Sequence, residues 1–262
     1  MTSAASERPV VIVTGASSGI GAAAAERLSA DHQVVACARR KSALDSLAAR
    51  IGCIPFQLDV TDSAASEAFV AEVVQRFGRL DALVLNAGIV IPSAIRELEL
   101  DAWQAQMAVN LTAPYVMTKA ALPHLLQSRG AVVAVSSIAA MQTGAGLAAY
   151  AAAKAGLSQF IRSLAFEHAR DGLRANVIAP GWIRTEMADE EMRMLPLGGD
   201  LEAAYAKVSE HVPQRRAGTA MEAAEAIAFL ISPAASFINA AVVPVDGGCT
   251  AANVGLTFFD SI

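Results

Sequence analysis

Apolar residues recur along this chain in short continuous runs that are rich in β-branched side chains. Runs of this kind are typical of strands that are buried on both faces of a parallel sheet. We expect strands at Val10–Val13, Val34–Ala38, Ile54–Leu58, Ala82–Leu85, Ala131–Ser136, Arg174–Ile178 and Ala241–Val245.

Alanine-rich stretches with helical spacing separate these runs. Strands that alternate with helices form βαβ units, and these build a parallel sheet with helices on both faces. The sequence therefore predicts an α/β fold in which a doubly wound parallel sheet of about seven strands forms a single domain over residues 1–262. We expect its helices around Gly21–Ala30, Ser42–Arg50, Ser63–Phe77, Leu100–Gln127, Ala148–Asp171 and Ala220–Ile231.

One stretch, Glu186 to Val212, follows neither pattern. It is rich in Met and Glu, with Leu-Gly-Gly-Asp in its middle. We expect this stretch, at about residues 186–212, to form a mobile lid over the substrate.

A glycine-rich turn, Thr-Gly-Ala-Ser-Ser-Gly-Ile-Gly, follows the first predicted strand and precedes a helix. Gly15, Gly19 and Gly21 would let backbone amides and the helix N-terminus approach a pyrophosphate with no Cβ atom in the way. Their spacing differs from the G-x-G-x-x-G pattern. The turn is not a P-loop either, because no Lys-Ser/Thr pair follows the last glycine, and a nucleoside triphosphate site is therefore disfavoured.

Three polar residues in the second half of the chain predict a proton-transfer site. Tyr150 and Lys154 are four positions apart, so a helix would place the phenol and the ammonium on one face. A free phenol has a pKa of about 10, and we expect the neighbouring cation to lower it toward neutrality. Ser137 would hydrogen-bond the same substrate oxygen that Tyr150 protonates. The alternative is that Tyr150 merely packs within an alanine-rich helix.

Composition excludes several classes of protein. A net charge of −5, a pI near 5.4 and 17% charged residues leave no basic surface for nucleic acid. No apolar run approaches the roughly 20 residues of a membrane span, and the N-terminal residues lack the apolar core of a signal peptide. The cysteines and histidines are scattered, which argues against disulfides and a metal site. We expect a cytoplasmic protein without membrane, metal or nucleic-acid partners.

Together these motifs resemble the short-chain dehydrogenase/reductase family. The resemblance covers about residues 9–248, with every motif in family order. It implies a Rossmann-type domain that binds a nicotinamide dinucleotide and exchanges hydride between its ring and a carbonyl or alcohol carbon. The matching segments are Thr14–Gly21, Asn86–Gly88, Asn110, Ser137, Tyr150, Lys154 and Pro180–Gly181.

The resemblance implies four catalytic residues: Asn110, Ser137, Tyr150 and Lys154. Tyr150 would donate the proton, Ser137 would polarise the substrate oxygen, and Lys154 would lower the phenol pKa and hold the nicotinamide ribose. Asn110 would interrupt the helix that begins near Leu100, so that a backbone carbonyl holds a water linking Lys154 to solvent. A core asparagine that only satisfies a kinked helix is the alternative.

The end of the second strand predicts the cofactor. NAD-binding folds usually place an acidic residue there for the ribose 2′-hydroxyl, whereas an arginine accommodates a 2′-phosphate. This chain has Ala38 followed by Arg39 and Arg40, which favours NADP(H). NAD(H) stays possible if the basic residues only form a solvated loop.

The remaining cofactor contacts follow from the family resemblance. Asp59 would meet the adenine amino group, unless it caps the following helix, and Asn86 would help to fix the sheet beside the adenosine ribose, or be mostly architectural. Ile183 and Thr185 would hold the nicotinamide carboxamide. The full predicted set is Gly15, Ser17, Ser18, Gly19, Ile20, Arg39, Arg40, Asp59, Val60, Asn86, Ala87, Gly88, Tyr150, Lys154, Pro180, Gly181, Ile183 and Thr185.

The predicted function is that of an NADP(H)-dependent carbonyl reductase or secondary alcohol dehydrogenase acting on a small ketone or aldehyde. Alternatives are an NAD-dependent alcohol or sugar dehydrogenase and a non-catalytic NADP-binding protein. A halohydrin dehalogenase on the same fold is disfavoured, because such enzymes usually replace the lysine by arginine and lose the glycine-rich loop. The family pairs the Leu100–Gln127 and Ala148–Asp171 helices across a two-fold axis, so we expect a homotetramer or, failing that, a dimer.

Overall fold

The computed structural model describes residues 8–251. Residues 1–7, which carried the argument against a signal peptide, and residues 252–262 lie outside that range. Its main sheet has seven parallel strands in the order β3-β2-β1-β4-β5-β6-β9. The predicted doubly wound sheet is thereby confirmed. The strands are β1 Val10–Thr14, β2 Gln33–Ala38, β3 Ile54–Gln57, β4 Ala82–Leu85, β5 Ala131–Val135, β6 Arg174–Pro180 and β9 Val242–Val245.

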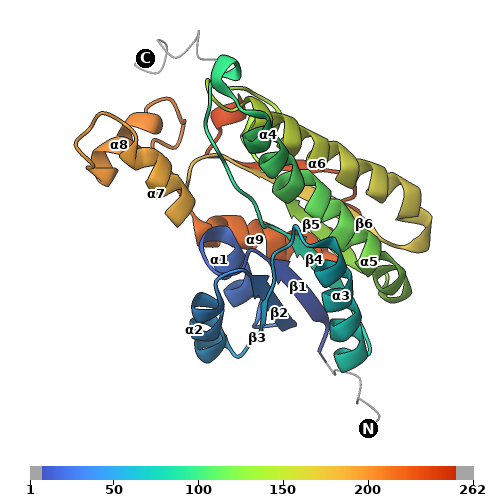
Figure 1. Cartoon of the computed structure of the whole chain (residues 1–262). Helices are drawn as coiled ribbons and strands as arrows, with labels where there is room; N and C mark the ends of the chain where they lie inside the picture. The colour runs from blue at the N-terminus through green and yellow to red at the C-terminus, as the bar shows by residue number, and fades with distance from the viewer. Residues whose placement is uncertain (1–7, 252–262) are drawn as a thin grey trace.

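Helices cover both faces of this sheet (Figure 1). Alternate residues of β1 supply both cores: Val11 and Val13 pack in one, and Val10 and Ile12 in the other. Such two-sided burial explains the uninterrupted apolar runs of the strands. On the first face lie α1 Gly19–Leu28, α2 Lys41–Ile51 and α9 Ala220–Ile231, and on the second α3 Ser63–Phe77, α4 Leu100–Met107, α5 Ala113–Ser128 and α6 Ala148–His168.

The strand order reverses between β1 and β4, which are neighbours at the centre of the sheet. In open α/β sheets such a reversal leaves a crevice beyond the carboxyl ends of the strands. The glycine-rich turn follows β1, and Asn86 follows β4, so both segments meet at this crevice.

The segment after β6 contains two short helices rather than an irregular loop. These are α7 Glu186–Arg193 and α8 Leu201–Val208, and Figure 1 shows them projecting to one side of the domain. Met192 of α7 and Tyr205 of α8 share a small separate core. Each helix has only eight residues, too few for a clear periodicity, and each begins at a capping side chain. A two-stranded sheet of β7 Ile183–Arg184 and β8 Gly218–Thr219 lies at the base of this unit.

Gly21 marks a close approach between α1 and the segment after β4. A Cβ atom on Gly21 would lie 2.3 Å from Asn86 Nδ2 and 2.4 Å from the Gly15 carbonyl oxygen. That amide group is already fixed, because Asn86 Nδ2 donates to the carbonyl oxygens of Thr14 at 2.9 Å and Gly15 at 3.2 Å. Gly21 is thus required for packing within the protein. Asn86 holds the glycine-rich turn in place, which is the architectural role that we considered for it.

We predict that Gly21→Ala lowers the free energy of unfolding by about 1–3 kcal/mol, because overpacking outweighs helix propensity. At an unobstructed helix position the same change would stabilise by roughly 0.5–1 kcal/mol. Denaturant unfolding of the purified variants measures the difference. Gly144→Ala is the control, since a Cβ there would meet its nearest atom at an ordinary 3.5 Å. A more stable Gly21→Ala variant would contradict the packing argument.

Candidate active site

A cavity of about 680 Å³ lies beyond the carboxyl ends of the strands and extends to α7. Its walls bring together segments that are distant in the sequence, from the glycine-rich turn to α6. All eighteen cofactor-binding residues predicted from the sequence lie on these walls, as do Ser137, Tyr150 and Lys154.

Two elements position the predicted proton-transfer residues. Ser137 lies two residues after the end of β5 and caps the 3₁₀ turn Ile138–Ala140. Its Oγ accepts a 3.1 Å hydrogen bond from the Ala139 backbone amide. Tyr150 and Lys154 lie on α6, and Lys154 Nζ is 5.7 Å from the centre of the Tyr150 ring. The expectation that phenol and ammonium share one face of a helix is confirmed.

The pKa of the phenol differs from the expectation. Burial raises the pKa of Tyr150 to about 12; interaction with the Ser137 hydroxyl lowers it, and the charge of Glu191 raises it further. Lys154 does not offset this loss of hydration. The prediction that the cation lowers the pKa of Tyr150 is wrong for this structure, in which the phenol stays protonated at neutral pH.

Lys154 is buried and its ammonium has a backbone partner. The residue is 3% exposed, and its Nζ donates a 2.8 Å hydrogen bond to the Val135 carbonyl at the end of β5. Burial lowers the pKa of this ammonium to about 8. Ser136 Oγ also donates to the Lys154 carbonyl at 3.0 Å, and Ser158 Oγ lies 2.8 Å from Ser136 Oγ. These contacts fix α6 against the end of β5.

Asn110 stands one layer behind the cavity wall. It lies in a π-helical turn, Ala108–Thr112, that separates α4 from α5, which confirms the predicted interruption of the helix. The side chain is fully buried; Oδ1 accepts from the Ile89 amide at 3.0 Å and Nδ2 donates to the Ile89 carbonyl at 2.9 Å. Asn110 therefore fixes the segment after β4, and its part in a water relay stays a prediction.

Gly88 lies between Asn110 and the cavity. A Cβ atom at this position would come within 3.0 Å of Asn110 Oδ1 and 3.3 Å of Lys154 Nζ. The absence of a side chain at Gly88 thus lets the asparagine and the lysine approach the same stretch of backbone.

The basic loop after β2 forms the opposite end of the cavity. Arg39 is exposed and its guanidinium makes no hydrogen bond or ion pair with residues 8–251. Arg40 donates from Nη1 to Glu186 Oε2 at 2.7 Å and from Nε to Ser17 Oγ at 3.2 Å. One arginine is therefore available to a ligand, and the other joins the loop to the start of α7.

Asp59 is not the cap of α3. Its Oδ1 accepts hydrogen bonds from the backbone and hydroxyl of Thr61, which lower the pKa of the carboxyl group. The cap is Asp62, whose Oδ1 accepts from the Ala65 amide at 2.9 Å. The alternative that Asp59 serves as the helix cap is therefore wrong, and Asp59 lies on the cavity wall.

Several wall residues were not predicted from the sequence. They come from the loop between the 3₁₀ turn after β5 and α6, and from the segment that runs from Trp182 through α7. Neither segment has a strand or helix periodicity long enough to reveal which side chains point inward. The Met- and Glu-rich composition of the segment after β6 was the only available signal. These residues include Gln142, Leu147, Trp182, Met187, Glu190, Glu191 and Met194.

Residues 8–251 contain no cluster of three or more His, Cys, Asp or Glu side chains arranged to hold a metal ion. No helix in this range is long and apolar enough to cross a membrane.

Comparisons with known proteins cover nearly the whole chain. The family described as Enoyl-(Acyl carrier protein) reductase matches residues 15–250. Meso-2,3-butanediol dehydrogenase of Serratia marcescens is 35% identical over 94% of this chain and 96% of its own length. A 3-oxoacyl-[acyl-carrier-protein] reductase of Salmonella typhimurium is 36% identical over 92% of this chain and 97% of its own.

Solved structures agree. An oxidoreductase of the short-chain dehydrogenase/reductase family from Burkholderia thailandensis superposes with a TM-score of 0.87 at 34% identity, over 98% of this chain and 99% of that one. An actinorhodin polyketide ketoreductase variant solved with NADPH superposes with a TM-score of 0.88 at 33% identity, over 94% of this chain and 99% of that one. The chain belongs to the short-chain dehydrogenase/reductase family and is an oxidoreductase that uses a nicotinamide cofactor on an alcohol or carbonyl group.

Proposed function

We propose that this protein is an NADP(H)-dependent carbonyl reductase, reversible as a secondary alcohol dehydrogenase, with Tyr150 as the general acid. The observation that carries this proposal is the meeting of Ser137, Tyr150 and Lys154 on the same cavity wall as the glycine-rich turn. The relatives named above act on substrates of different kinds, so their names do not select a substrate for this chain.

The residues fit a nicotinamide dinucleotide. Gly15 and Gly19 have positive φ angles of 65° and 54°, which fold the turn after β1 so that α1 begins at the cavity. Arg39 offers an unoccupied guanidinium to a 2′-phosphate at the other end. The cofactor, when bound, supplies the hydride.

The chain's own residues supply proton transfer and orientation. Tyr150, protonated at neutral pH because burial raises its pKa to about 12, is ready to donate its proton to the developing alkoxide. The Ser137 hydroxyl donates a hydrogen bond to the same oxygen. Lys154 places an ammonium beside the phenol ring, where it stabilises the phenolate that remains after transfer. We propose that Asn110 interrupts the helix so that a backbone carbonyl holds a water linking Lys154 to solvent, and that the proton is replaced through this water.

We further propose that α7 and α8 act as the substrate lid. Their shared core and the Tyr205 hydroxyl, which donates to Asp189 Oδ1 at 2.7 Å, make them one unit.

We also propose that the protein assembles as a homotetramer or, failing that, as a dimer. Tyr115 on α5 and Phe166 on α6 leave aromatic side chains 46% and 86% exposed on the helices expected to pair.

We predict that Tyr150→Phe reduces turnover at least roughly 100-fold, as expected for loss of a general acid. Cofactor binding and thermal unfolding should change little, since the ring is kept. The loss of NADPH absorbance with a panel of ketones measures turnover. Tyr115→Phe is the matched control, because this tyrosine is exposed on α5. Retention of more than about a tenth of the wild-type rate by Tyr150→Phe would remove Tyr150 from the mechanism.

We predict that Lys154 makes stability depend on alkaline pH. Its pKa falls from 10.5 to about 8 on folding, so between these values the unfolded chain binds more protons and stability rises with pH. Relative to Lys154→Met, the wild-type free energy of unfolding should increase by up to about 3 kcal/mol between about pH 7 and pH 10.5. Denaturant titrations across this range test it, and parallel profiles for the two proteins would show that the lysine is not buried as a cation.

We predict that Arg39→Ala weakens NADPH binding roughly 10- to 150-fold and hardly changes NADH binding, because one charged hydrogen-bond partner is lost. Ala38→Asp should shift the preference further, since a carboxylate repels the phosphate and accepts a hydrogen bond from a free ribose hydroxyl. Dissociation constants for both cofactors decide between them. Lys41→Ala removes a positive charge from the first residue of α2, directly after this loop, and serves as the control. Equal affinities in the wild type would favour the NAD-linked alternative.

A further inference from the structure

The cavity that Tyr150 lines is mainly apolar, and Leu147, Met187 and Met194 are among its lining residues. One half-buried carboxylate, that of Glu191 on α7, lines the same cavity. Its carboxylate makes no hydrogen bond or ion pair with any described residue of the chain.

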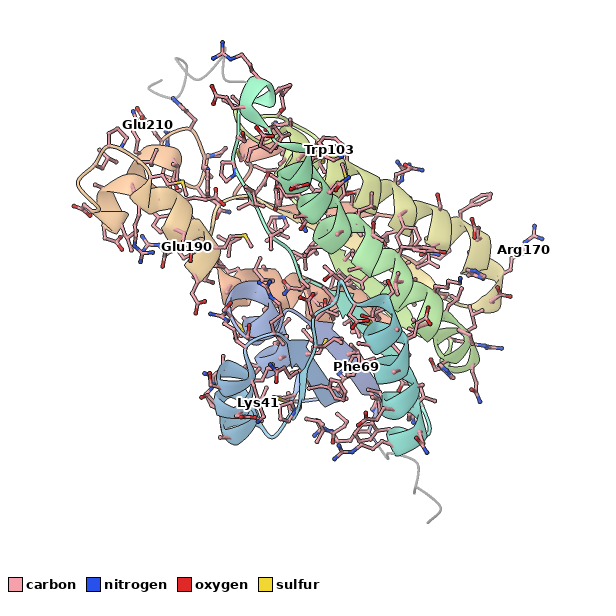
Figure 2. The ribbon with its side chains drawn as sticks, viewed as in Figure 1. Lys41, Phe69, Trp103, Arg170, Glu190 and Glu210 are labelled. Carbon is pink, nitrogen blue, oxygen red and sulfur yellow. The ribbon has the colours of Figure 1, made fainter. Side chains whose placement is uncertain are left out.

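Two other acidic residues of α7 have partners, which sets Glu191 apart. Glu186 pairs with Arg40 at 2.7 Å, and Asp189 accepts the hydrogen bond of the Tyr205 hydroxyl. Glu190, which is labelled on α7 in Figure 2, is exposed to solvent. Glu191 is therefore the carboxylate of this helix that has lost water without gaining a protein partner, and such a group is destabilising until a ligand supplies a donor.

Electrostatics relate Glu191 to the reaction centre. Loss of water raises the pKa of the Glu191 carboxyl, and the charge of Glu191 in turn raises the pKa of Tyr150. Because Tyr150 and Glu191 line the same cavity, a substrate whose reacting oxygen meets Tyr150 occupies the space that Glu191 also borders.

A substrate can supply the missing donor. The phosphates of the cofactor would repel this carboxylate, and the donors of its nicotinamide end are assigned to Ile183, Thr185 and Lys154 in the proposed binding mode. Lys154 is already bonded to the Val135 carbonyl. An ammonium group carries three donors, some of which a mainly apolar cavity would leave unsatisfied, whereas a hydroxyl carries one.

We propose that Glu191 is a specificity-determining residue that accepts a hydrogen bond from a hydroxyl group next to the reacting carbon, so that the substrates are vicinal diols and the corresponding α-hydroxy carbonyl compounds. This inference rests on the proposed function of Tyr150, which would bind the reacting oxygen while Glu191 binds its neighbour. The same negative charge disfavours substrates that carry a carboxylate at that position.

A binding experiment separates this inference from the catalytic proposal. NADPH and an alcohol form a complex that cannot react, so calorimetry on the NADPH-saturated enzyme measures affinity without turnover. The probes are butane-2,3-diol and 3-methylbutan-2-ol, which differ by a methyl group in place of a hydroxyl. The wild type should bind the diol at least roughly 10-fold more tightly, as expected for a hydrogen bond to a charged group.

Variants then assign the preference to the residue. Glu191→Met should abolish the preference for the diol, and Glu191→Gln, which keeps the shape of the side chain, should reduce it. Glu190→Gln removes the same charge from the neighbouring position and should retain most of the preference. Circular dichroism checks that each variant is folded.

The outcomes are distinct. Absence of diol binding, equal affinities in the wild type, a preserved preference in Glu191→Met, or an equal loss in Glu190→Gln would each overturn the inference. A Tyr150→Phe variant that retains turnover would instead overturn the proposed function, and it would do so whatever the diol affinities are.

Discussion

The side-chain amide of Asn86 makes the contacts on which the rest of the site depends. It joins the ends of β1 and β4, the two strands between which the sheet order reverses, by donating to the carbonyls of Thr14 and Gly15. The Thr14 hydroxyl completes the junction, since it accepts a hydrogen bond from the backbone N–H of Asn86 at 2.9 Å and donates one to the Val84 carbonyl at 3.2 Å. The glycine-rich turn can open toward the cavity because its base is held in this way.

Burial of Lys154 is the second constraint, and it opposes stability. A solvated lysine would cost the fold less than an ammonium held at 3% exposure, whose pKa falls to about 8. The surroundings are arranged to keep it in place: the Val135 carbonyl accepts from Nζ, and the Ser136 hydroxyl fixes the backbone of the same residue. Such a charge held near a phenol is expected where the group serves chemistry more than folding.

The sequence predicted the sheet well because its strands are buried on both faces, which leaves an unmistakable apolar run for each. It also predicted the part of the cavity wall that follows strand ends, since ligand residues in this type of sheet lie there. It failed where the outcome depends on competition between tertiary effects. Helix spacing shows that Tyr150 and Lys154 are neighbours, but it does not show that loss of hydration dominates the pKa of the phenol. Likewise, nothing local distinguishes Asp59 from Asp62 as a cap, because both precede α3 within a few residues.

The segment after β6 shows the same limit in another form. Whether Glu191 faces the cavity or solvent depends on how α7 packs against α8, through contacts such as that of Met192, and on the cap at Thr185. The first two turns of α7 thus place carboxylates in three different surroundings: an ion pair with Arg40, a hydrogen bond with Tyr205 of α8, and a half-buried position on the cavity wall that Tyr150 also lines. Because the first of these contacts joins α7 to Arg40 and the third faces the reaction centre, this short helix connects the two ends of the cavity. A substitution that reorients α7 would therefore act on cofactor and substrate together, whereas one confined to the Glu191 side chain would act on the substrate alone.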